Sequence, residues 1–326
     1  MPYTPFGKGG NPFEDLGRSI LQRQGIVPTE NPWQCHIFIA NHNSLSQRFI
    51  LAKTKLRALV KPMLVWTHEP RYCKIFTKTA KGPGMIGRVH FMNGYTGDLY
   101  LNNYSFYSWA IEPPKLDIAA IEASDSLRSR PIGALLTYIN DPETRRIFIK
   151  GDRNLDLCAL RQEIALAGHA RNLVDIYGRD WPGNISTGLS KAGDGWHGPK
   201  IDILRSYRFN LCLENTSYDY YCTEKIWDAI HAGCLPIYYG KNNRIYDDFP
   251  RDSFLDAAQY SSVADLLDHV ETMSKEEYRE RRAKCISVYN RFLEKDSFEA
   301  QYERAILSTA NRVKSIVLKT HDGNKN

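Results

Sequence analysis

The stretch that decides the fold runs from Arg208 to Gly240 and reads RFNLCLENTSYDYYCTEKIWDAIHAGCLPIYYG. It predicts a strand at 208–215, a loop, a helix that begins at Thr223 and is ended by Gly233, and a second strand at 234–240. Strands that alternate with helices are typical of a parallel α/β sheet, and ligands bind where the loops leave the carboxyl ends of such strands. We therefore expect an α/β fold with a ligand site at this loop.

Polar side chains fill the loop and the first turn of the helix. In chain order they are Glu214, Asn215, Thr216, Tyr218, Tyr220, Thr223, Glu224 and Lys225. Free amides and the positive end of the helix dipole favour an anion here. Lys225 opposes that dipole at a cost of roughly 0.3–1 kcal/mol, which a bound diphosphate would offset. The Glu224 carboxylate is suited to accept hydrogen bonds from ribose or sugar hydroxyls. From spacing alone, a cap at Thr223 followed by two solvated charges is an open alternative.

The rest of the chain repeats the alternation of apolar runs and helical patterns. Strands are predicted at 35–40, 62–66, 88–92, 131–139 and 173–178, with a loop at 78–87. Helices are predicted at 12–24, 46–59, 155–166, 200–207, 274–293 and 297–318. A length of 326 residues suits two domains. We expect them at 1–150 and 151–300, with a helix and tail at 301–326 that are free to pack back on the first domain.

Composition limits the class of protein. No run approaches the about 18 apolar residues of a membrane span, and the first residues lack the layout of a signal peptide. The seven cysteines are an odd number without a C-x-x-C pair, which indicates reduced thiols. We expect a soluble, cytoplasmic protein. Its net charge of +6 is compatible with a diphosphate ligand and with peripheral attachment to the inner membrane.

The segment 207–240 resembles the signature of the α-1,3/4-fucosyltransferases, glycosyltransferase family 10. The resemblance rests on Tyr207-Arg208-Phe209, Leu213-Glu214-Asn215, Asp219-Tyr220, Thr223-Glu224-Lys225-Ile226-Trp227 and Pro236-Ile237-Tyr238-Tyr239-Gly240. Leu213 and Cys222 replace the family's usual Phe and its Ile or Val, and both exchanges are apolar. Upstream, the resemblance continues at Leu160-Arg161-Gln162-Glu163, at 174–179 and at Lys200.

The resemblance implies a GT-B type fold of two facing Rossmann-like domains and an inverting transfer of L-fucose from GDP-β-L-fucose to a glycan hydroxyl. The first domain would bind the acceptor, a GlcNAc or Glc of a lactosamine-like glycan or surface polysaccharide, and the second would bind the donor. The implied donor-binding residues are Lys200, Glu214, Asn215, Tyr220, Thr223, Glu224, Lys225, Arg179 and Arg161. For Arg161, an ordinary surface charge on a helix is the alternative. The Gly-rich segment 181–198 lacks the arginine that some members place there.

In the first domain, Glu69 follows the predicted strand at 62–66, and its loop WTHEP resembles the family loop that carries the proposed general base. An inverting transfer needs one carboxylate to take the acceptor proton. His68 is the competing base, because histidine titrates closer to neutral pH. The segment 91–107, dense in Tyr, Asn and Thr, resembles the family segment that reaches toward donor and acceptor. We expect His68, Tyr95 and Thr96 to line that cleft.

Metal and cofactor sites are not predicted. Asp residues never occur two positions apart, so a D-x-D metal pair is lacking, and no His/Cys pair has zinc spacing. Protein cations would then neutralise the leaving diphosphate. Two alternatives stay open: the same fold with another nucleotide-sugar donor, and a nucleic-acid-binding protein suggested by the charge and the 19 tyrosines. Because the basic residues form no stripe, we expect GDP-fucose and an oligosaccharide or polysaccharide acceptor as partners, and no nucleic acid.

Overall fold

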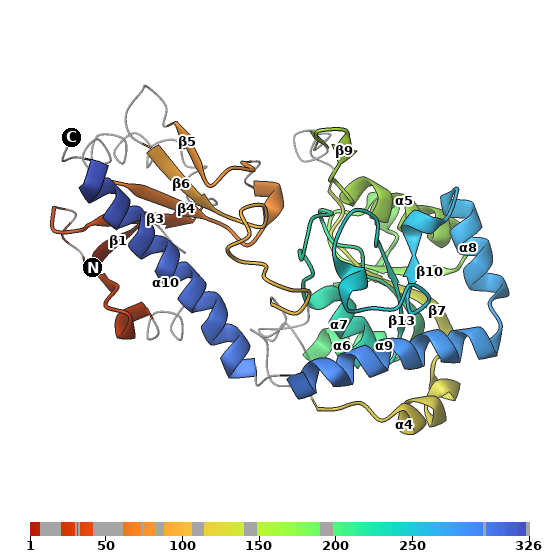
Figure 1. Cartoon of the computed structure of the whole chain (residues 1–326). Coiled ribbons are helices and arrows are strands. Elements are labelled where there is room, and N and C mark those ends of the chain that lie inside the picture. The colour runs from red at the N-terminus through yellow and green to blue at the C-terminus, as the bar shows by residue number, and fades with distance from the viewer. Residues whose placement is uncertain are drawn as a thin grey trace. The chain divides into compact units, whose positions relative to one another are not determined.

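The structure, a computed structural model, describes most of the chain. The described residues are 1–6, 21–29, 31, 33–41, 61–72, 75–81, 88–105, 114–139, 149–189, 198–295 and 298–323. They divide into two compact units, one formed by 1–108 together with 298–326 and the other by 109–297 (Figure 1). The predicted helix at 46–59 lies outside the described residues, as does most of the one at 12–24.

The first unit contains a six-stranded sheet with the order β2-β1-β3-β4-β6-β5. The strands are β1 (Pro2–Phe6), β2 (Val27–Pro28), β3 (Ile37–Asn41), β4 (Met63–Trp66), β5 (Thr79–Lys81) and β6 (Arg88–Met92). Only the β5–β6 pair is antiparallel. The strands predicted at 35–40, 62–66 and 88–92 are confirmed. The segment predicted as a loop at 78–87 instead begins with β5, because a three-residue edge strand is too short to show a hydrophobic period and is defined by its pairing with β6.

The core of this sheet comes from apolar residues that alternate along its strands. Cys35, Phe38, Met63, Val65 and Phe91 form one buried cluster. All four residues of β4 are buried, as expected for a central parallel strand covered on both faces. The residues that follow β4 are therefore anchored at the carboxyl edge of the sheet.

The long helix α10 (Phe298–Gly323) belongs to this first unit and crosses its sheet in Figure 1. The Ser308 hydroxyl donates to the carbonyl of Asp98 at 3.2 Å, and the Arg312 guanidinium donates to the carbonyl of Lys78 at 3.0 Å. The first unit is thus built from both ends of the chain.

The second unit contains a parallel six-stranded sheet with the order β11-β10-β7-β12-β13-β14. Its strands are β7 (Arg130–Leu135), β10 (Val174–Tyr177), β11 (Ser186–Gly188), β12 (Tyr207–Leu211), β13 (Leu235–Tyr238) and β14 (Leu255–Asp256). A separate hairpin joins β8 (Ile149–Lys150) to β9 (Arg153–Asn154). The helices are α4 (Ile118–Ala123), α5 (Cys158–Ala170), α6 (Gly198–Leu204), α7 (Glu224–His231), α8 (Val263–Thr272) and α9 (Lys275–Lys295). These elements confirm the helices predicted at 155–166, 200–207 and 274–293.

The boundary between the units differs from the one predicted near residue 150. The strand predicted at 131–139 forms as β7, but it pairs with β10 and β12 of the second sheet. Residues 109–150 therefore belong to the second unit. Close packing supports this pairing: a Cβ atom on Gly133 would lie 2.9 Å from the Tyr207 ring, so only glycine leaves room for that side chain. Such a contact between distant segments gives no local signal in the sequence.

The chain reverses direction in the second sheet between β7 and β12. After β7 it proceeds outward through β10 and β11, then crosses to the other side of β7 to form β12, β13 and β14. A switch point of this kind is where ligands bind in open α/β sheets, beyond the carboxyl ends of the strands. The loop from β12 to α7 leaves the sheet at this point.

Helix α7 is fixed by apolar packing and by a glycine. Trp227 is fully buried and its ring lies 5.2 Å from Phe292 of α9 and 5.4 Å from Phe249. Gly233 ends the helix with φ +79°, a left-handed conformation that favours glycine. A Cβ atom there would also collide with the Arg128 guanidinium. The predicted helix boundaries are confirmed, and these contacts fix the position of α7 in the second unit.

Two global features concern the whole described chain. No helix among the described residues is long and apolar enough to cross a membrane. The six described cysteines are buried free thiols, as expected from the odd cysteine count.

Candidate functional site

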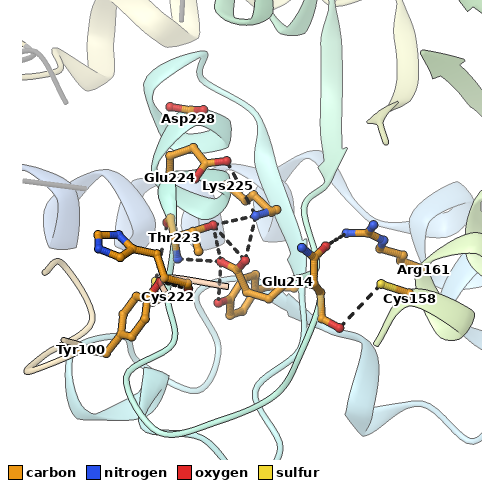
Figure 2. A network of polar contacts seen from close by, with 12 residues as sticks. Tyr100, Cys158, Arg161, Glu214, Cys222, Thr223, Glu224, Lys225 and Asp228 are labelled. Atoms are coloured by element: carbon orange, nitrogen blue, oxygen red, sulfur yellow. Dashed lines mark hydrogen bonds and ion pairs between the residues drawn. The ribbon is translucent and has the colours of Figure 1, made fainter. Parts of the chain in front are cut away.

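The carboxylate of Glu214 organises the loop that follows β12. Glu214 is 2% exposed, and its carboxylate accepts hydrogen bonds from the Thr223 amide at 2.7 Å and the Thr223 hydroxyl at 2.8 Å. Figure 2 shows these bonds converging on one buried side chain. Thr223 occupies the N-cap position of α7, yet its side chain makes no capping bond to the helix. The predicted cap is wrong in this detail, because the hydroxyl donates to the Glu214 carboxylate and its oxygen accepts from the Lys225 ammonium group.

Lys225 completes this arrangement from the first turn of α7. Its ammonium group donates to Glu214 at 2.9 Å and to the Thr223 hydroxyl at 2.7 Å. A lysine that opposes its own helix dipole therefore has a counterion inside the protein. The sequence predicts a bound diphosphate as the counterion, and the structure adds Glu214 to that role.

Burial and charge act in opposite directions on the two glutamates of the cluster. Burial raises the pKa of Glu214, although the Lys225 charge and the Thr223 amide act against the shift. Burial also opposes the charge on Glu224, but Lys225 and Lys200 outweigh it, so the pKa of Glu224 is lowered. Glu224 lies 3.7 Å from the Lys225 ammonium group. It is therefore an ionised acceptor, as its predicted role toward hydroxyl groups requires.

A second ion pair joins α6 to α7. The Lys200 ammonium donates to Asp228 at 2.7 Å, and the Asp228 side chain is 1% exposed. Burial opposes the charge on Lys200, yet the carboxylates of Asp228 and Glu224 outweigh it and raise its pKa. Lys200, predicted to bind donor, is thus brought to the α7 cluster. Asp228 was not predicted, although it lies one helical turn after Glu224.

The charges of the α7 cluster do not balance. Its members are Glu214, Glu224, Asp228, Lys200 and Lys225, that is three carboxylates and two ammonium groups. The formal sum of these charges is −1. A diphosphate placed here therefore needs a further cation.

Arg161 of α5 is positioned to supply that cation. Its side chain is 5% exposed and donates from Nη1 to the side-chain oxygen of Asn215, in the same loop as Glu214. Its Nε is buried without a hydrogen-bond partner among the described residues. The alternative of an ordinary surface charge is therefore wrong. A buried guanidinium that bonds only a neutral amide retains its full charge for an anion.

Asn215 is held in place from two sides. Its carbonyl accepts from the Leu157 amide at 3.1 Å, at the start of α5, while its side chain accepts from Arg161. Both contacts tie the β12–α7 loop to α5, and Figure 2 shows the one made by Arg161. The predicted residues Asn215 and Arg161 therefore come together in the structure.

Two other predicted donor residues are not joined to the α7 cluster by a bond that the structure describes. Arg179 is exposed after β10, and its carbonyl accepts from the Tyr138 amide at 3.0 Å. Tyr220 donates its hydroxyl to Asp247 at 3.0 Å and adopts φ +56°. That backbone conformation costs on the order of 1–3 kcal/mol and is concentrated at functional sites. Residues 190–197 of the predicted Gly-rich segment at 181–198 lie outside the described residues.

In the first unit, Glu69 lies directly after β4, as predicted. Its backbone amide donates to the Thr67 hydroxyl at 3.1 Å, and the side chain is half-buried. The neighbouring His68 ring lies 4.8 Å from Trp66. Burial lowers the pKa of His68 to about 3, so its imidazole is neutral at physiological pH.

Tyr95 supports the Glu69 loop, whereas Thr96 bonds within its own turn. The Tyr95 hydroxyl donates to the Pro70 carbonyl at 3.1 Å, and the Thr96 hydroxyl donates to the Asn93 carbonyl at 3.1 Å. Both residues are buried. Tyr100, which the sequence did not single out, donates to the His68 carbonyl at 2.7 Å. The Tyr- and Asn-rich segment thus acts through the backbone of residues 68–70.

No group of three His, Cys, Asp or Glu side chains among the described residues is arranged to hold a metal ion.

Comparison with known proteins agrees with this arrangement. Residues 165–283 match the family model "Glycosyltransferase family 10 (fucosyltransferase) C-term". The chain is 30% identical over 127 residues to 3-galactosyl-N-acetylglucosaminide 4-alpha-L-fucosyltransferase FUT3 of Pan troglodytes, covering 38% of this chain and 31% of that protein. It is 37% identical over 71 residues to alpha-(1,3)-fucosyltransferase FucT of Helicobacter pylori, covering 22% of this chain and 15% of that protein. The matches thus span less than a third of either relative.

A solved structure extends the likeness to both units. The crystal structure of an alpha1,3-fucosyltransferase with GDP aligns with 97% of this chain and 89% of its own, with a TM-score of 0.54 at 17% sequence identity. This match confirms the predicted α/β fold of the GT-B type. The family signature lies on the β12–α7 segment, and residues 165–283 of the second unit match the C-terminal model of glycosyltransferase family 10, so this part of the chain is similar to that family.

Proposed function

We propose that this protein transfers L-fucose from GDP-β-L-fucose to a hydroxyl of an acceptor glycan, with inversion at the anomeric carbon. The observation that carries the proposal is Arg161, a buried arginine whose Nε lacks a partner among the described residues and whose Nη1 donates to the Asn215 side chain. A guanidinium in this state is suited to a phosphate group. Relatives named as fucosyltransferases and a solved relative with GDP support GDP-fucose as the donor.

Arg161 also offsets the excess negative charge of the α7 cluster, which would otherwise repel a diphosphate. The α7 cluster has a formal charge of −1, and Arg161 brings the sum to zero. The free amides at the start of α7 add partial positive charge. Lys225 and Arg161 would contact phosphate oxygens, and Glu224 would accept bonds from sugar or ribose hydroxyls.

In the proposed reaction, Glu69 is the base that takes the proton of the acceptor hydroxyl. The acceptor oxygen forms a bond to the anomeric carbon of fucose as the bond from that carbon to the diphosphate oxygen breaks. The proton of the hydroxyl passes to the Glu69 carboxylate, GDP leaves, and the product is an α-L-fucoside. Because burial lowers the pKa of His68 from 6.5 to about 3, its imidazole is a weaker base than an exposed histidine.

The acceptor is proposed to be GlcNAc or Glc of a lactosamine-like glycan or a surface polysaccharide, with transfer to O3. We further propose that no metal ion is required and that the protein works in the cytoplasm. The absence of a D-x-D pair from the sequence supports the first point. A different nucleotide-sugar donor is the remaining alternative.

The test is binding of GDP measured by calorimetry on the full chain, followed by product analysis. Arg161→Gln should weaken GDP about ten- to hundredfold, because one charge-assisted contact to phosphate is lost. Arg279→Gln, which removes the same charge from an exposed site on α9, is the matched control and should leave the affinity unchanged. Incubation with GDP-fucose and N-acetyllactosamine should yield an α-1,3-fucoside. Turnover with another nucleotide sugar but not with GDP-fucose would overturn the donor assignment.

A further inference from the structure

A second pocket lies in the second unit, at the carboxyl ends of β13 and β14. Its volume is about 440 Å³, and the loop after β13 and the residues around β14 line it. We call it the β13–β14 pocket. None of the charged residues of the α7 cluster lines it, although Tyr220, a predicted donor residue, donates to Asp247 in its lining.

Arg251 forms one wall of the pocket and is held by an aromatic ring. Its guanidinium carbon lies 4.7 Å from the centre of the Tyr246 ring. That ring in turn stacks on Phe254 at 5.4 Å with an interplanar angle of 14°. Stacking orients a guanidinium without using its N–H donors. The donors of Arg251 are therefore available to a ligand in the pocket.

The carboxylates of the pocket are already engaged by protein groups. Asp256 accepts from the Gly240 amide at 2.8 Å and from the Tyr246 hydroxyl at 2.6 Å. Asp247 accepts from Arg244 at 2.9 Å and from Tyr220 at 3.0 Å. These bonds hold both carboxylates in place and leave fewer of their lone pairs for a ligand.

The result is an excess of positive charge. Lys241 and Arg251 are exposed, and neither has a carboxylate partner among the described residues. With Arg244 the pocket holds three cations against the two carboxylates, a formal sum of +1. An anionic ligand would receive charge-assisted bonds from Lys241 and Arg251 together.

The size and remaining polar groups specify the ligand further. A pocket of about 440 Å³ falls within the roughly 300–1,000 Å³ of small-molecule sites and is larger than one phosphate group needs. Asn242 and Gln259 present exposed side-chain amides on the same lining, and amides pair with hydroxyl groups as donor and as acceptor. Cations that bind an anion next to amides that bind hydroxyl groups are expected in a site for a sugar phosphate.

We propose that the β13–β14 pocket binds a sugar that carries a phosphate group, with the phosphate on Arg251 and Lys241 and the sugar hydroxyls on Asn242 and Gln259. The site does not depend on fucosyl transfer. We assign this phosphate to a sugar phosphate outside the membrane, and binding to an anionic lipid headgroup is the outcome that would overturn the assignment.

The experiment titrates the full chain with glucose 6-phosphate by calorimetry, with glucose as the uncharged probe. Glucose 6-phosphate should bind and glucose should not. Lys241→Gln and Arg251→Gln should each weaken glucose 6-phosphate about tenfold, as expected for one charge-assisted contact. Arg279→Gln is the control of equal charge change and should have no effect. Because Lys241 packs against no ring, its variant tests the site even if Arg251→Gln unfolds the loop.

Two further arms separate the possible outcomes. Saturating GDP should leave the affinity for glucose 6-phosphate unchanged, whereas competition by GDP would make the pocket part of the donor site and overturn the proposal. Vesicles of phosphatidylcholine with phosphatidylserine should bind no better than vesicles of phosphatidylcholine alone. Binding to the anionic vesicles without binding of glucose 6-phosphate would assign the pocket to a membrane surface instead. GDP affinity, measured in the same titrations, reports separately on the proposed donor site.

Discussion

The ammonium group of Lys225 lies 2.9 Å from the carboxylate of Glu214, and this contact joins the first turn of α7 to the loop that leaves β12. The carboxylate is almost completely buried, whereas the side chain of the lysine is 19% exposed. Lys225 therefore has one side toward its internal counterion and one toward solvent. A diphosphate that binds at the start of α7 would share the lysine with Glu214 rather than find it unpaired.

Replacing Lys225 with Ala should weaken GDP and also destabilise the protein. GDP affinity should fall about ten- to hundredfold, because a charge-assisted bond to phosphate is lost. The free energy of unfolding should fall by about 3 kcal/mol, because Glu214 is left as a buried carboxylate without its ammonium partner. Calorimetry with GDP and chemical denaturation measure the two effects.

A double variant separates those effects. Lys225→Ala combined with Glu214→Gln should regain part of the lost stability, since the unpaired buried charge is removed, but it should not regain GDP affinity. Lys275→Ala, at an exposed position at the start of α9, is the control for loss of a lysine at a helix start. Unchanged GDP affinity in Lys225→Ala would show that the phosphate site is wrongly placed.

Glu69→Gln should reduce turnover by about 10²–10⁴-fold while donor affinity stays nearly constant. The amide keeps the shape of the side chain but cannot take the acceptor proton. His68→Asn is the matched comparison and should cost far less, because the pKa of about 3 already makes the imidazole a poor base. Steady-state kinetics with calorimetry of GDP-fucose distinguishes the two. The reverse order of effects would assign the base to His68.

Activity should survive treatment with EDTA. Lys225 and Arg161 are proposed to neutralise the leaving diphosphate, and the sequence lacks a D-x-D pair. Initial rates of fucose transfer before and after chelation, with magnesium or manganese added back, make the measurement. Loss of turnover that the added metal restores would show that a bound cation carries part of the charge.

The stability of the protein should depend on pH through His68. Burial lowers the pKa of this imidazole from 6.5 to about 3, so the unfolded chain binds a proton there more readily than the folded one. The stabilisation is complete above pH 6.5 and is lost progressively as the pH falls from 6.5 toward 3. Between pH 7 and pH 5, the free energy of unfolding should fall more steeply with pH in the wild type than in His68→Asn. The difference between the two slopes should correspond to at most one bound proton. The free energies are measured by urea denaturation at each pH. An equal pH dependence in the wild type and in His68→Asn would contradict the burial of a neutral His68.

The second sheet was predictable from sequence because buried parallel strands are continuous apolar runs between helical segments. The segments that became β10, β12, β13 and α7 each carry that pattern with clear end signals, such as Gly233. The assignment of β7 to the second sheet was not predictable. It depends on pairing with β10 and β12, which are distant along the chain.

Prediction of the candidate site from sequence was also incomplete, because the directions of its side chains depend on the tertiary fold. The residue types around Thr223 indicated an anion site, and Arg161 and Asn215 do come together. The direction of the Glu214 side chain, turned inward onto Thr223 and Lys225, follows from the tertiary fold. Spacing along the sequence does not contain that information.

The contacts of α10 with the first unit affect the order in which the protein forms on the ribosome. Residues 109–297 make up the second unit without a break, so all of its strands have left the ribosome before α10 is synthesised. The first unit receives α10 only after the whole second unit has been synthesised, since Ser308 and Arg312 bond to Asp98 and Lys78. A nascent chain stopped before residue 298 would therefore carry a complete second unit together with a first unit that still lacks α10.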